Sequence, residues 1–268
     1  MQKVISKLRA VLWFLKRPRL YPEFFRRVIP RLLSWSRPPD TRREAERWCE
    51  ERAIGTSEAI AKITGSPMHG AVRENFKDIF AAAEDVYRMC PIESELGGAA
   101  NLDLLYWLAE YLEAEKIVET GVAYGWSSLA ILLSLTKRNN TLLVSTNMPY
   151  IGRNYDKYVG CVVPDEFKSH HKIIKRADRD ALPRVLKELQ TIDMCHYDSD
   201  KSYTGRMWAY PRLWKALKLG GCFISDDIGD NLAFRDFCDQ VNVDPIIVRT
   251  PEVERVKYVG ILVKSSFG

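Results

Sequence analysis

The chain of 268 residues is long enough for one large α/β domain or two small ones, and its apolar and charged fractions, 46% and 28%, are those of a folded protein. Residues 1–39 hold ten Lys/Arg and one Glu, a net charge of +9. Residues 40–268 hold 30 basic and 34 acidic residues, a net charge of −4. This acidic body argues against a nucleic-acid partner, because a nucleic-acid surface needs basic residues opposite the phosphates.

The six cysteines are scattered, with no Cys-x-x-Cys pair and no zinc-ligand spacing. We therefore expect free thiols in a reducing compartment, which makes the cytoplasm the expected location. No apolar run reaches the roughly 18 residues that a membrane span needs, and no small-residue cleavage site follows the N-terminal apolar patch.

Residues 1–39 read as a basic amphipathic arm. The first apolar stripe, which includes Leu8, Leu12 and Leu15, has helical spacing and stops at Pro18, because proline breaks a helix interior. A second arginine-rich amphipathic piece follows and ends at Pro38–Pro39. Two interpretations stay open: the arm lies on the cytoplasmic face of an anionic membrane, or its apolar face packs on the body or on a second subunit.

Residues 40–115 read mainly as helices and form the expected cap or lead-in region. From residue 116 to 268 short β-like runs alternate with helices, which indicates βαβ units and a mostly parallel sheet. One of these helices, over 205–221, is expected to stop at Gly220–Gly221. The last two β-like runs have too short a link for a helical crossover, so we expect an antiparallel strand at the end of the chain.

The stretch 118–128, "VETGVAYGWSS", places Glu119, Gly121 and Gly125 at the exit of the first sheet strand. Glycine there lets the backbone pass close to a ligand, and open α/β sheets bind ligands beyond the carboxyl ends of their strands. The Gly-x-x-x-Gly spacing is a weak signal alone, because glycines also punctuate ordinary turns.

Acidic residues follow two later β-like runs. Asp198 ends one, and Asp226–Asp227 end the next. Neighbouring strands lie about 4.8 Å apart, so their ends can gather three carboxylates, which then need protons or a cation between them. Carboxylate oxygens without Cys or His favour Mg²⁺ or another hard divalent ion. The plainer interpretation is that these aspartates cap helices or sit solvated in loops.

An ordered series of motifs resembles class I S-adenosylmethionine-dependent methyltransferases, over about 140 residues. It consists of "VETGVAYG", "LVSTNMP", "VGCVVPDEF", "IDMCHYDSDKSY" and "ALKLGGCFISDDIGDN". The series is most similar to the small bacterial metal-dependent O-methyltransferases of the sugar or macrocin type, which are related to the catechol/caffeoyl type. The resemblance implies a Rossmann-like methyltransferase fold with a seven-stranded sheet, an antiparallel last strand and helices on both faces.

The resemblance also implies cofactor contacts for S-adenosylmethionine. The ribose position reads Asn147, where the family carries an acidic residue, so the charge-assisted bond to the ribose is lost. The adenine is expected beside Asp178. The amino-acid end of the cofactor is expected against Glu119, Gly121, Gly125 and Ser127.

For the reaction, the resemblance implies metal ligands at Asp198, Asp226 and Asp227. The two branches of the family differ in the base: the phenol branch uses a lysine, here Lys201, and the sugar branch an aspartate, here Asp200. An aspartate is already ionised at neutral pH and can accept a proton, whereas a lysine needs its pKa lowered before it can act as a base. We therefore take Asp200 as the base, assisted by Lys201, with the reverse assignment as the alternative.

Three functions are compatible with this pattern. The first is Mg²⁺-assisted methyl transfer to a hydroxyl of a small polyhydroxyl molecule such as a sugar, a glycan or a glycosylated natural product. The second is catechol or phenol O-methylation, which needs an aromatic pocket that Tyr87, Tyr106 or Trp107 would supply. The third is a non-catalytic module of the same fold acting at a membrane surface or in an assembly. A helical lead-in often covers a site or forms a dimer, so a homo-oligomer is among the expected partners.

Overall fold

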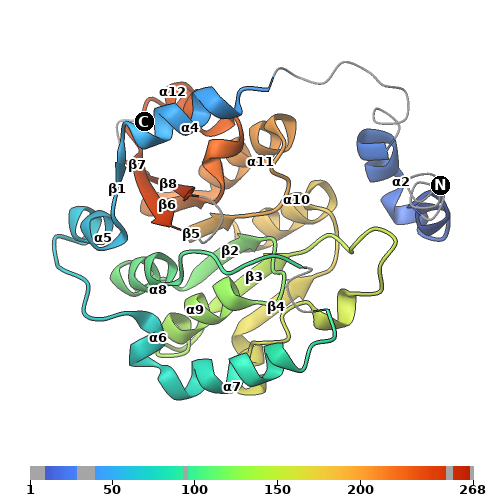
Figure 1. Cartoon of the computed structure of the whole chain (residues 1–268), viewed down its shortest axis with the longest axis horizontal. Coiled ribbons are helices and arrows are strands. Elements are labelled where there is room, and N and C mark those ends of the chain that lie inside the picture. Colours follow the sequence, from blue (N-terminus) through green and yellow to red (C-terminus); the bar gives the residue numbers. More distant parts are fainter. Residues whose placement is uncertain (1–9, 29–39, 93–95, 252–255, 266–268) are drawn as a thin grey trace.

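The computed structural model describes residues 10–28, 40–92, 96–251 and 256–265. Its centre is an eight-stranded sheet with the order β1-β7-β8-β6-β5-β2-β3-β4 (Figure 1). The strands are β1 (Ala53–Ile54), β2 (Lys116–Thr120), β3 (Leu142–Thr146), β4 (His171–Ile174), β5 (Ile192–Tyr197), β6 (Leu217–Ser225), β7 (Ile246–Pro251) and β8 (Val256–Val263). All pairings are parallel except those of β8, which runs antiparallel to both β6 and β7.

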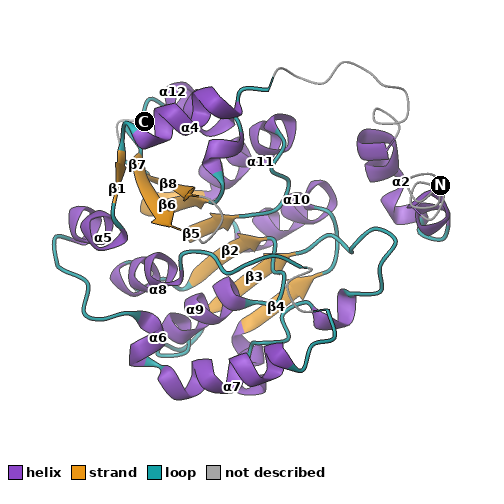
Figure 2. Cartoon of the chain, viewed as in Figure 1, coloured by secondary structure: helices purple, strands orange, loops and turns teal. Residues whose placement is uncertain are grey.

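Helices cover both faces of this sheet (Figure 2). They are α4 (Arg42–Glu50), α5 (Thr56–Thr64), α6 (Val72–Asn75), α7 (Lys77–Arg88), α8 (Leu102–Tyr111), α9 (Trp126–Leu135), α10 (Asp178–Leu189), α11 (Tyr203–Ala216) and α12 (Ala233–Val241). Short 3₁₀ turns η3 (Asp156–Tyr158), η4 (Asp165–His170) and η5 (Ile228–Asp230) join some of them.

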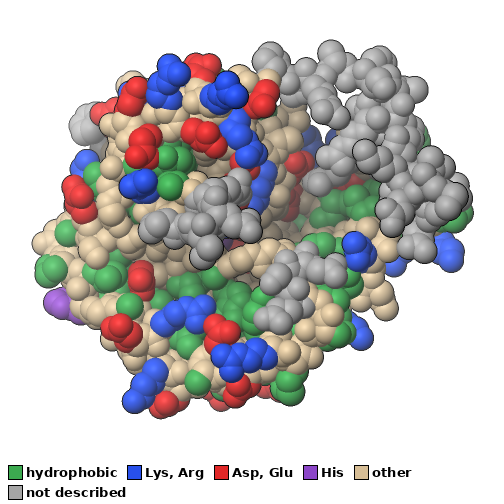
Figure 3. All heavy atoms as spheres, in the orientation of Figure 1, with side chains coloured by type: hydrophobic (Ala, Val, Ile, Leu, Met, Phe, Trp, Pro, Cys, Tyr) green, Lys and Arg blue, Asp and Glu red, His purple; other side chains and the backbone are tan. Residues whose placement is uncertain are grey.

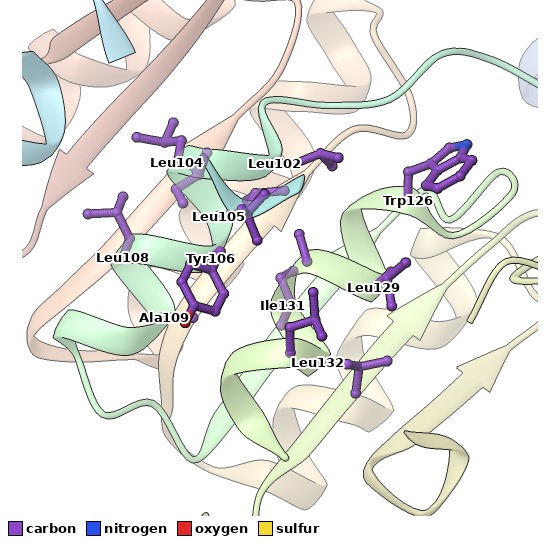
Figure 4. Close-up of a cluster of buried hydrophobic side chains, with 14 of the residues drawn as sticks. Leu102, Leu104, Leu105, Tyr106, Leu108, Ala109, Trp126, Leu129, Ile131 and Leu132 are labelled. Atoms are coloured by element: carbon purple, nitrogen blue, oxygen red, sulfur yellow. The ribbon is translucent and has the colours of Figure 1, made fainter. Parts of the chain in front are cut away.

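The apolar residues of the strands alternate between two cores. In β2, Ile117 faces the core built with α5, α8 and α9, and Val118 faces the core built with α10, α11 and α12. Figure 4 shows the first core, where Leu105 of α8 and Ile131 of α9 meet between the two helices. Every residue of α9 is buried, as expected for a helix that is apolar on all sides.

The predicted fold class is confirmed: the sheet is mostly parallel, its last strand is antiparallel, and helices lie on both faces. The strand count differs, because the region predicted as helical contributes an edge strand. Ala53 and Ile54 pair with Ile247 and Val248 of β7, which makes eight strands instead of seven. Two residues between helices are too short a run for the sequence pattern to indicate a strand.

The helix expected over 205–221 ends earlier than predicted, at Ala216. The backbone of Leu217 is extended and pairs with Ile192 of β5, because the Leu217 side chain packs in the core beneath α11. The ammonium of Lys264 donates to the carbonyl oxygens of Trp214 (2.9 Å) and Leu217 (2.8 Å) and so satisfies the end of the helix. Lys264, which directly follows β8, therefore caps the end of this helix, which does not extend to Gly220–Gly221.

The N-terminal arm is described from residue 10 to 28. Residues 10–15 are helical, and η1 (Pro18–Leu20), α2 (Tyr21–Glu23) and the π-helical turn η2 (Phe24–Val28) follow Arg17. Trp13 and Phe14 are buried in a small cluster that includes Met148 and Ile151 of the loop after β3. One face of the arm therefore packs on the body; residues 1–9 and 29–39 of the predicted arm lie outside the described residues.

Within the described ranges, no helix combines the length and the apolar character needed to cross a bilayer.

Candidate functional site

A cavity of about 420 Å³ lies at the carboxyl ends of four adjacent strands. Its lining includes Gly121 after β2, Asn147 after β3, Asp198 after β5 and Asp226 after β6. The chain runs from β2 outward to β3 and β4 and then crosses back to β5 on the other side of β2, so the cavity sits at the topological switch point of the sheet.

Gly121 is required by the tight turn that leaves β2. Its φ of +84° is strained for any side chain, and a Cβ there would lie 2.2 Å from the backbone oxygen of Asp198. Its N–H donates to the oxygen of Thr146 at 2.8 Å. The exits of β2, β3 and β5 are thus held in direct backbone contact at this residue.

Lys201 holds two of the carboxylates at the end of the sheet. Its ammonium lies 2.9 Å from Oδ1 of Asp198 and also donates to Oδ2 of Asp227. Burial opposes the charge of the ammonium, but Asp198 and Asp227 outweigh it and raise the pKa of Lys201 above its ordinary value. Burial and the nearby Asp226 raise the pKa of Asp198 to about 6, against the opposing effect of Lys201.

His196 forms a second buried charge centre, beneath the cavity. Its Nδ1 lies 3.5 Å from Glu119 and its Nε2 lies 3.5 Å from Asp226, and the imidazole is fully buried. Burial alone would lower the pKa of His196, but Asp226 and Glu119 raise it to about 10. The imidazole is therefore protonated at neutral pH, and it lies between Glu119 of β2 and Asp226, which follows β6.

Arg206 holds the backbone of the acid pair from below. It is fully buried in α11, and its guanidinium donates to the carbonyl oxygens of Asp226 (3.1 Å) and Asp227 (2.8 Å). Asp227 itself has a φ of +51°, a conformation that aspartate adopts more readily than most residues. Arg206 and this left-handed turn together fix the two aspartates at the cavity floor.

Residues 118–228 match the model of a family described as a methyltransferase domain. This part of the chain is a methyltransferase domain. It includes the end of β2 from Val118, the glycine turn, every described carboxylate of the cavity, and His196, Lys201 and Arg206. No curated protein sequence matches the chain.

Two solved structures share the fold. The O-methyltransferase TomG of Streptomyces achromogenes, solved with SAM, is 18% identical with a TM-score of 0.54, and the match covers 83% of this chain and 99% of TomG. Cofactor-bound Rv0187 from MTB is 14% identical with a TM-score of 0.53, and the match covers 70% of this chain and 91% of that chain. At these identities the likeness establishes the fold alone.

The structure brings only part of the predicted cofactor set to the cavity of the methyltransferase domain. Gly121, Asn147 and Asp178 line it. Gly125 packs on the backbone of Gly160 instead, where a Cβ would come within 2.9 Å of the Gly160 Cα. At both glycines the close approach is to the chain itself, at Gly121 to Asp198 and at Gly125 to Gly160, and the predicted approach to a ligand stays a prediction.

Glu119 and Ser127 lie beneath the glycine turn and do not line the cavity. The fully buried Glu119 carboxylate accepts hydrogen bonds from the hydroxyls of Ser127 (2.6 Å), Ser128 (2.5 Å) and Ser145 (2.7 Å). Burial alone would raise the pKa of Glu119, but His196 and these hydroxyls together lower it. In this structure Glu119 acts as an internal anchor of the turn, and its predicted contact with the cofactor stays a prediction.

The predicted ribose and adenine residues are partly used by the protein itself. Asn147 Oδ1 accepts a hydrogen bond from the N–H of Val122 at 3.0 Å, and so ties the β3 exit to the β2 exit. The Asp178 carboxylate accepts hydrogen bonds from the hydroxyls of Thr146 and Ser199. Each keeps a place on the cavity wall, so the predicted cofactor contacts of Asn147 and Asp178 stay predictions.

The predicted bases are placed differently. Asp200 and Lys201 both line the cavity. Asp200 Oδ1 accepts hydrogen bonds from the N–H (3.2 Å) and the hydroxyl (2.8 Å) of Ser202, at the start of α11. Lys201 instead reaches between Asp198 and Asp227.

The predicted metal ligands do not converge on one point: Asp226 faces His196, and within the described residues no three His, Cys, Asp or Glu side chains are placed to hold one ion.

Sequence reasoning missed four residues of the site. No role was predicted for His196, which is a buried charged link between acids, or for Arg206, which binds the backbone of Asp226 and Asp227. Tyr150, in the loop after β3, and Lys257, near the start of β8, also line the cavity, and no motif indicates either residue. The one available signal for His196 was its position in β5, because the two neighbouring strands carry Glu119 or precede Asp226.

We expect Gly121→Ala to damage both stability and cofactor binding. The new methyl would displace the Asp198 backbone, and binding of S-adenosylhomocysteine measured by calorimetry should weaken at least about tenfold. Gly65→Ala is the matched control, because Gly65 has a similar φ of +73° at the end of α5 but nothing within 4 Å of its Cβ. It should cost about 1–2 kcal/mol of stability and leave binding unchanged. Equal effects of the two variants on binding would contradict the proposed close approach.

We expect Glu119→Gln to lower the free energy of unfolding by about 3 kcal/mol, measured by urea denaturation, because it removes one of the two acids that compensate the buried His196 charge. Glu110→Gln is the comparison: Glu110 pairs with Lys137 (2.7 Å) and Arg138 (3.2 Å) at the more exposed end of α8. That variant should cost about 1 kcal/mol or less. A loss for Glu119→Gln no larger than that of the comparison would show that the buried anchor adds little.

Proposed function

We propose that the chain is an S-adenosylmethionine-dependent O-methyltransferase that acts on a hydroxyl of a small polyhydroxyl molecule. One observation carries the proposal. A single cavity of the methyltransferase domain joins the β2 glycine turn, Asn147 and Asp178 on one wall to Asp198, Asp200 and Lys201 on another. A cofactor on the first wall would place its reactive end near the acidic residues of the second.

The first wall fits the cofactor by its donor and acceptor groups. Asn147 offers an amide, which can accept one hydrogen bond and donate another to a ribose hydroxyl, and Asp178 offers a carboxylate. TomG, whose fold this chain shares, was solved with SAM. S-adenosylmethionine, when bound, supplies an electrophilic methyl group on a sulfonium centre.

The second wall supports Asp200 as the base. Its carboxylate is oriented by Ser202 and lines the cavity, so it can take the proton from an acceptor hydroxyl as the oxygen attacks the methyl carbon. Lys201 is a poor base here, because Asp198 and Asp227 hold it as an ammonium. As an ammonium it would stabilise the negative charge that develops on the attacking oxygen, and the geometry of the cavity would align the two reactants.

The predicted Mg²⁺ does not fit the residues as they are arranged. Lys201 supplies the positive charge between Asp198 and Asp227, and Asp226 is turned to His196. If an ion is used, Asp198 and Asp227 would hold it after Lys201 moved away, and it would lower the pKa of a bound hydroxyl.

The lining supports a polyhydroxyl acceptor over a phenol. Carboxylates and the amines of Lys201 and Lys257 dominate the acceptor side, and the described lining holds one aromatic side chain, Tyr150. The aromatic residues that a phenol pocket was expected to use are elsewhere: Tyr87 packs on Tyr124 and Trp126, and Tyr106 packs on Phe76 and Trp107. A pocket rich in charged groups favours an acceptor with several hydroxyls.

The experiment that tests the proposal is a methyl-acceptor screen with purified protein. Deoxysugars, uronic acids and catechols are each incubated with S-adenosylmethionine, with a chelator or with added Mg²⁺, and formation of S-adenosylhomocysteine is measured. Turnover of a sugar-type acceptor supports the proposal, and turnover of catechols alone selects the phenol alternative. Absence of any heat of binding with either form of the cofactor would favour a non-catalytic module.

The same assay decides the role of the metal. Activity that survives the chelator would remove the ion from the mechanism. Activity that is lost and then restored by Mg²⁺ would show that Lys201 gives way to the ion.

We expect Asp200→Asn to lower kcat by at least about 10²-fold, because the amide cannot take the proton, while the affinity for S-adenosylhomocysteine changes little. Asp165→Asn is the control: Asp165 is an exposed acid on η4 that pairs with Lys168. It should leave kcat unchanged. If Lys201→Met abolishes turnover and Asp200→Asn does not, the assignment of the base is reversed.

A further inference from the structure

The N-terminal arm has two apolar faces, and the body covers one of them. The inner face, with Trp13, Phe14 and Leu20, is buried against the loop after β3. On the other side, Leu12, Leu15 and Phe25 keep 50%, 58% and 62% of their surface exposed. Exposed apolar residues are ordinary when single, but a continuous group on one short segment indicates a binding surface.

The exposed residues form one continuous strip. Leu12 and Leu15 are three residues apart on a helical turn and so lie on the same face. The hydroxyl of Tyr21, also exposed, donates to the carbonyl oxygen of Leu15 at 3.1 Å. Phe25 follows Tyr21 by four residues in the next helical turns. We call Leu12, Leu15, Tyr21 and Phe25 the outer apolar strip.

The charges around the strip are positive. Lys16 and Arg19 are exposed beside it, and Arg26 is exposed one residue after Phe25. Glu23, the one acid of residues 1–39, is buried and paired with Arg26, so this pair adds no net charge and Lys16 and Arg19 supply the positive charge beside the strip. Figure 3 shows basic and hydrophobic side chains together at the end of the molecule where Figure 1 places the arm.

We propose that the outer apolar strip and its basic neighbours bind the surface of an anionic lipid bilayer. Apolar residues that enter the headgroup region and cations that meet anionic headgroups are the two components of interfacial binding. The net charge of +9 over residues 1–39 matches such a surface, whereas the acidic body would be repelled from it. A second copy of this chain is the poorer occupant, because two such arms would bring like charges together.

The position of the arm relates this surface to the cavity. Met148 and Ile151 pack with the inner face of the arm and also line the cavity. Glu23 shares a small second cavity with Asp178, Arg179 and Asp200. A bilayer bound to the outer apolar strip would therefore be separated from the cavity by the arm and by the side chains of Met148 and Ile151.

The test is flotation of the full chain with vesicles of phosphatidylcholine alone or with about one-third phosphatidylserine. We expect binding to the anionic vesicles, weaker binding to the neutral ones, and loss of binding as salt screens the charges. The variant L12S/L15S/F25S should reduce the partition coefficient at least about tenfold. The variant K16S/R19S should reduce the preference for anionic over neutral lipid.

The matched control substitutes three exposed apolar residues far from the arm, Met89, Tyr111 and Leu219, which are 76%, 51% and 67% exposed. The variant M89S/Y111S/L219S should float like the unaltered chain. Thermal unfolding and S-adenosylhomocysteine binding check that each variant is folded, since none of these side chains is buried. Equal flotation of L12S/L15S/F25S and the unaltered chain overturns the proposal. The proposal is also overturned if the unaltered chain does not float and instead forms a dimer, measured by sedimentation, that the variant L12S/L15S/F25S dissociates.

Discussion

The site depends on how four carboxylates are neutralised at the end of one sheet. Glu119, Asp198, Asp226 and Asp227 follow or end three adjacent strands, and their charges could not all be buried unpaired. Three cations of the chain meet them. His196 lies between Glu119 and Asp226, Lys201 between Asp198 and Asp227, and Arg206 binds the backbone oxygens of the acid pair. These three cations come from β5, the loop after it and α11, so one strand–loop–helix unit supplies the charge that holds its neighbours.

This arrangement couples the two walls of the cavity. Glu119 anchors the glycine turn through three hydroxyls, and the same carboxylate faces His196, whose other nitrogen faces Asp226. The turn on the cofactor side and the acid on the acceptor side are therefore held by one buried chain of charges. Such a chain is strong only when each member keeps its partner, because the protein interior screens an uncompensated charge poorly. In this way Glu119 and Ser127, which do not line the cavity, are connected to both of its walls.

The sequence predicted well what depends on local pattern and poorly what depends on pairing across the fold. Alternating strands and helices predicted the sheet and its antiparallel last strand. The glycine at the first strand exit indicated a tight turn, and the close approach found there is to the backbone of Asp198. The strand exits placed Asp198, Asp200 and Lys201 at the cavity. The early end of α11 was not predictable, because Leu217 is drawn into the sheet by its partner Ile192 and capped by Lys264. The cation among the carboxylates was expected to be a metal, because no sequence rule says where a flexible lysine will point.

The arm illustrates a different limit of pattern reasoning. Packing on the body and binding to a membrane were treated as alternatives because an amphipathic helix is usually assigned one apolar stripe. Trp13 and Phe14 satisfy the first interpretation, yet Leu12 and Leu15 on the same turns stay exposed. A short helical segment that is apolar on two sides can serve both purposes, since the body needs only the inner one. Packing of the inner face also holds the outer strip in a fixed orientation, which lowers the entropy lost when the strip meets a surface. The two interpretations therefore support each other: the contact with the loop after β3 is what would let residues 10–28 present one defined face to lipid beside the cavity.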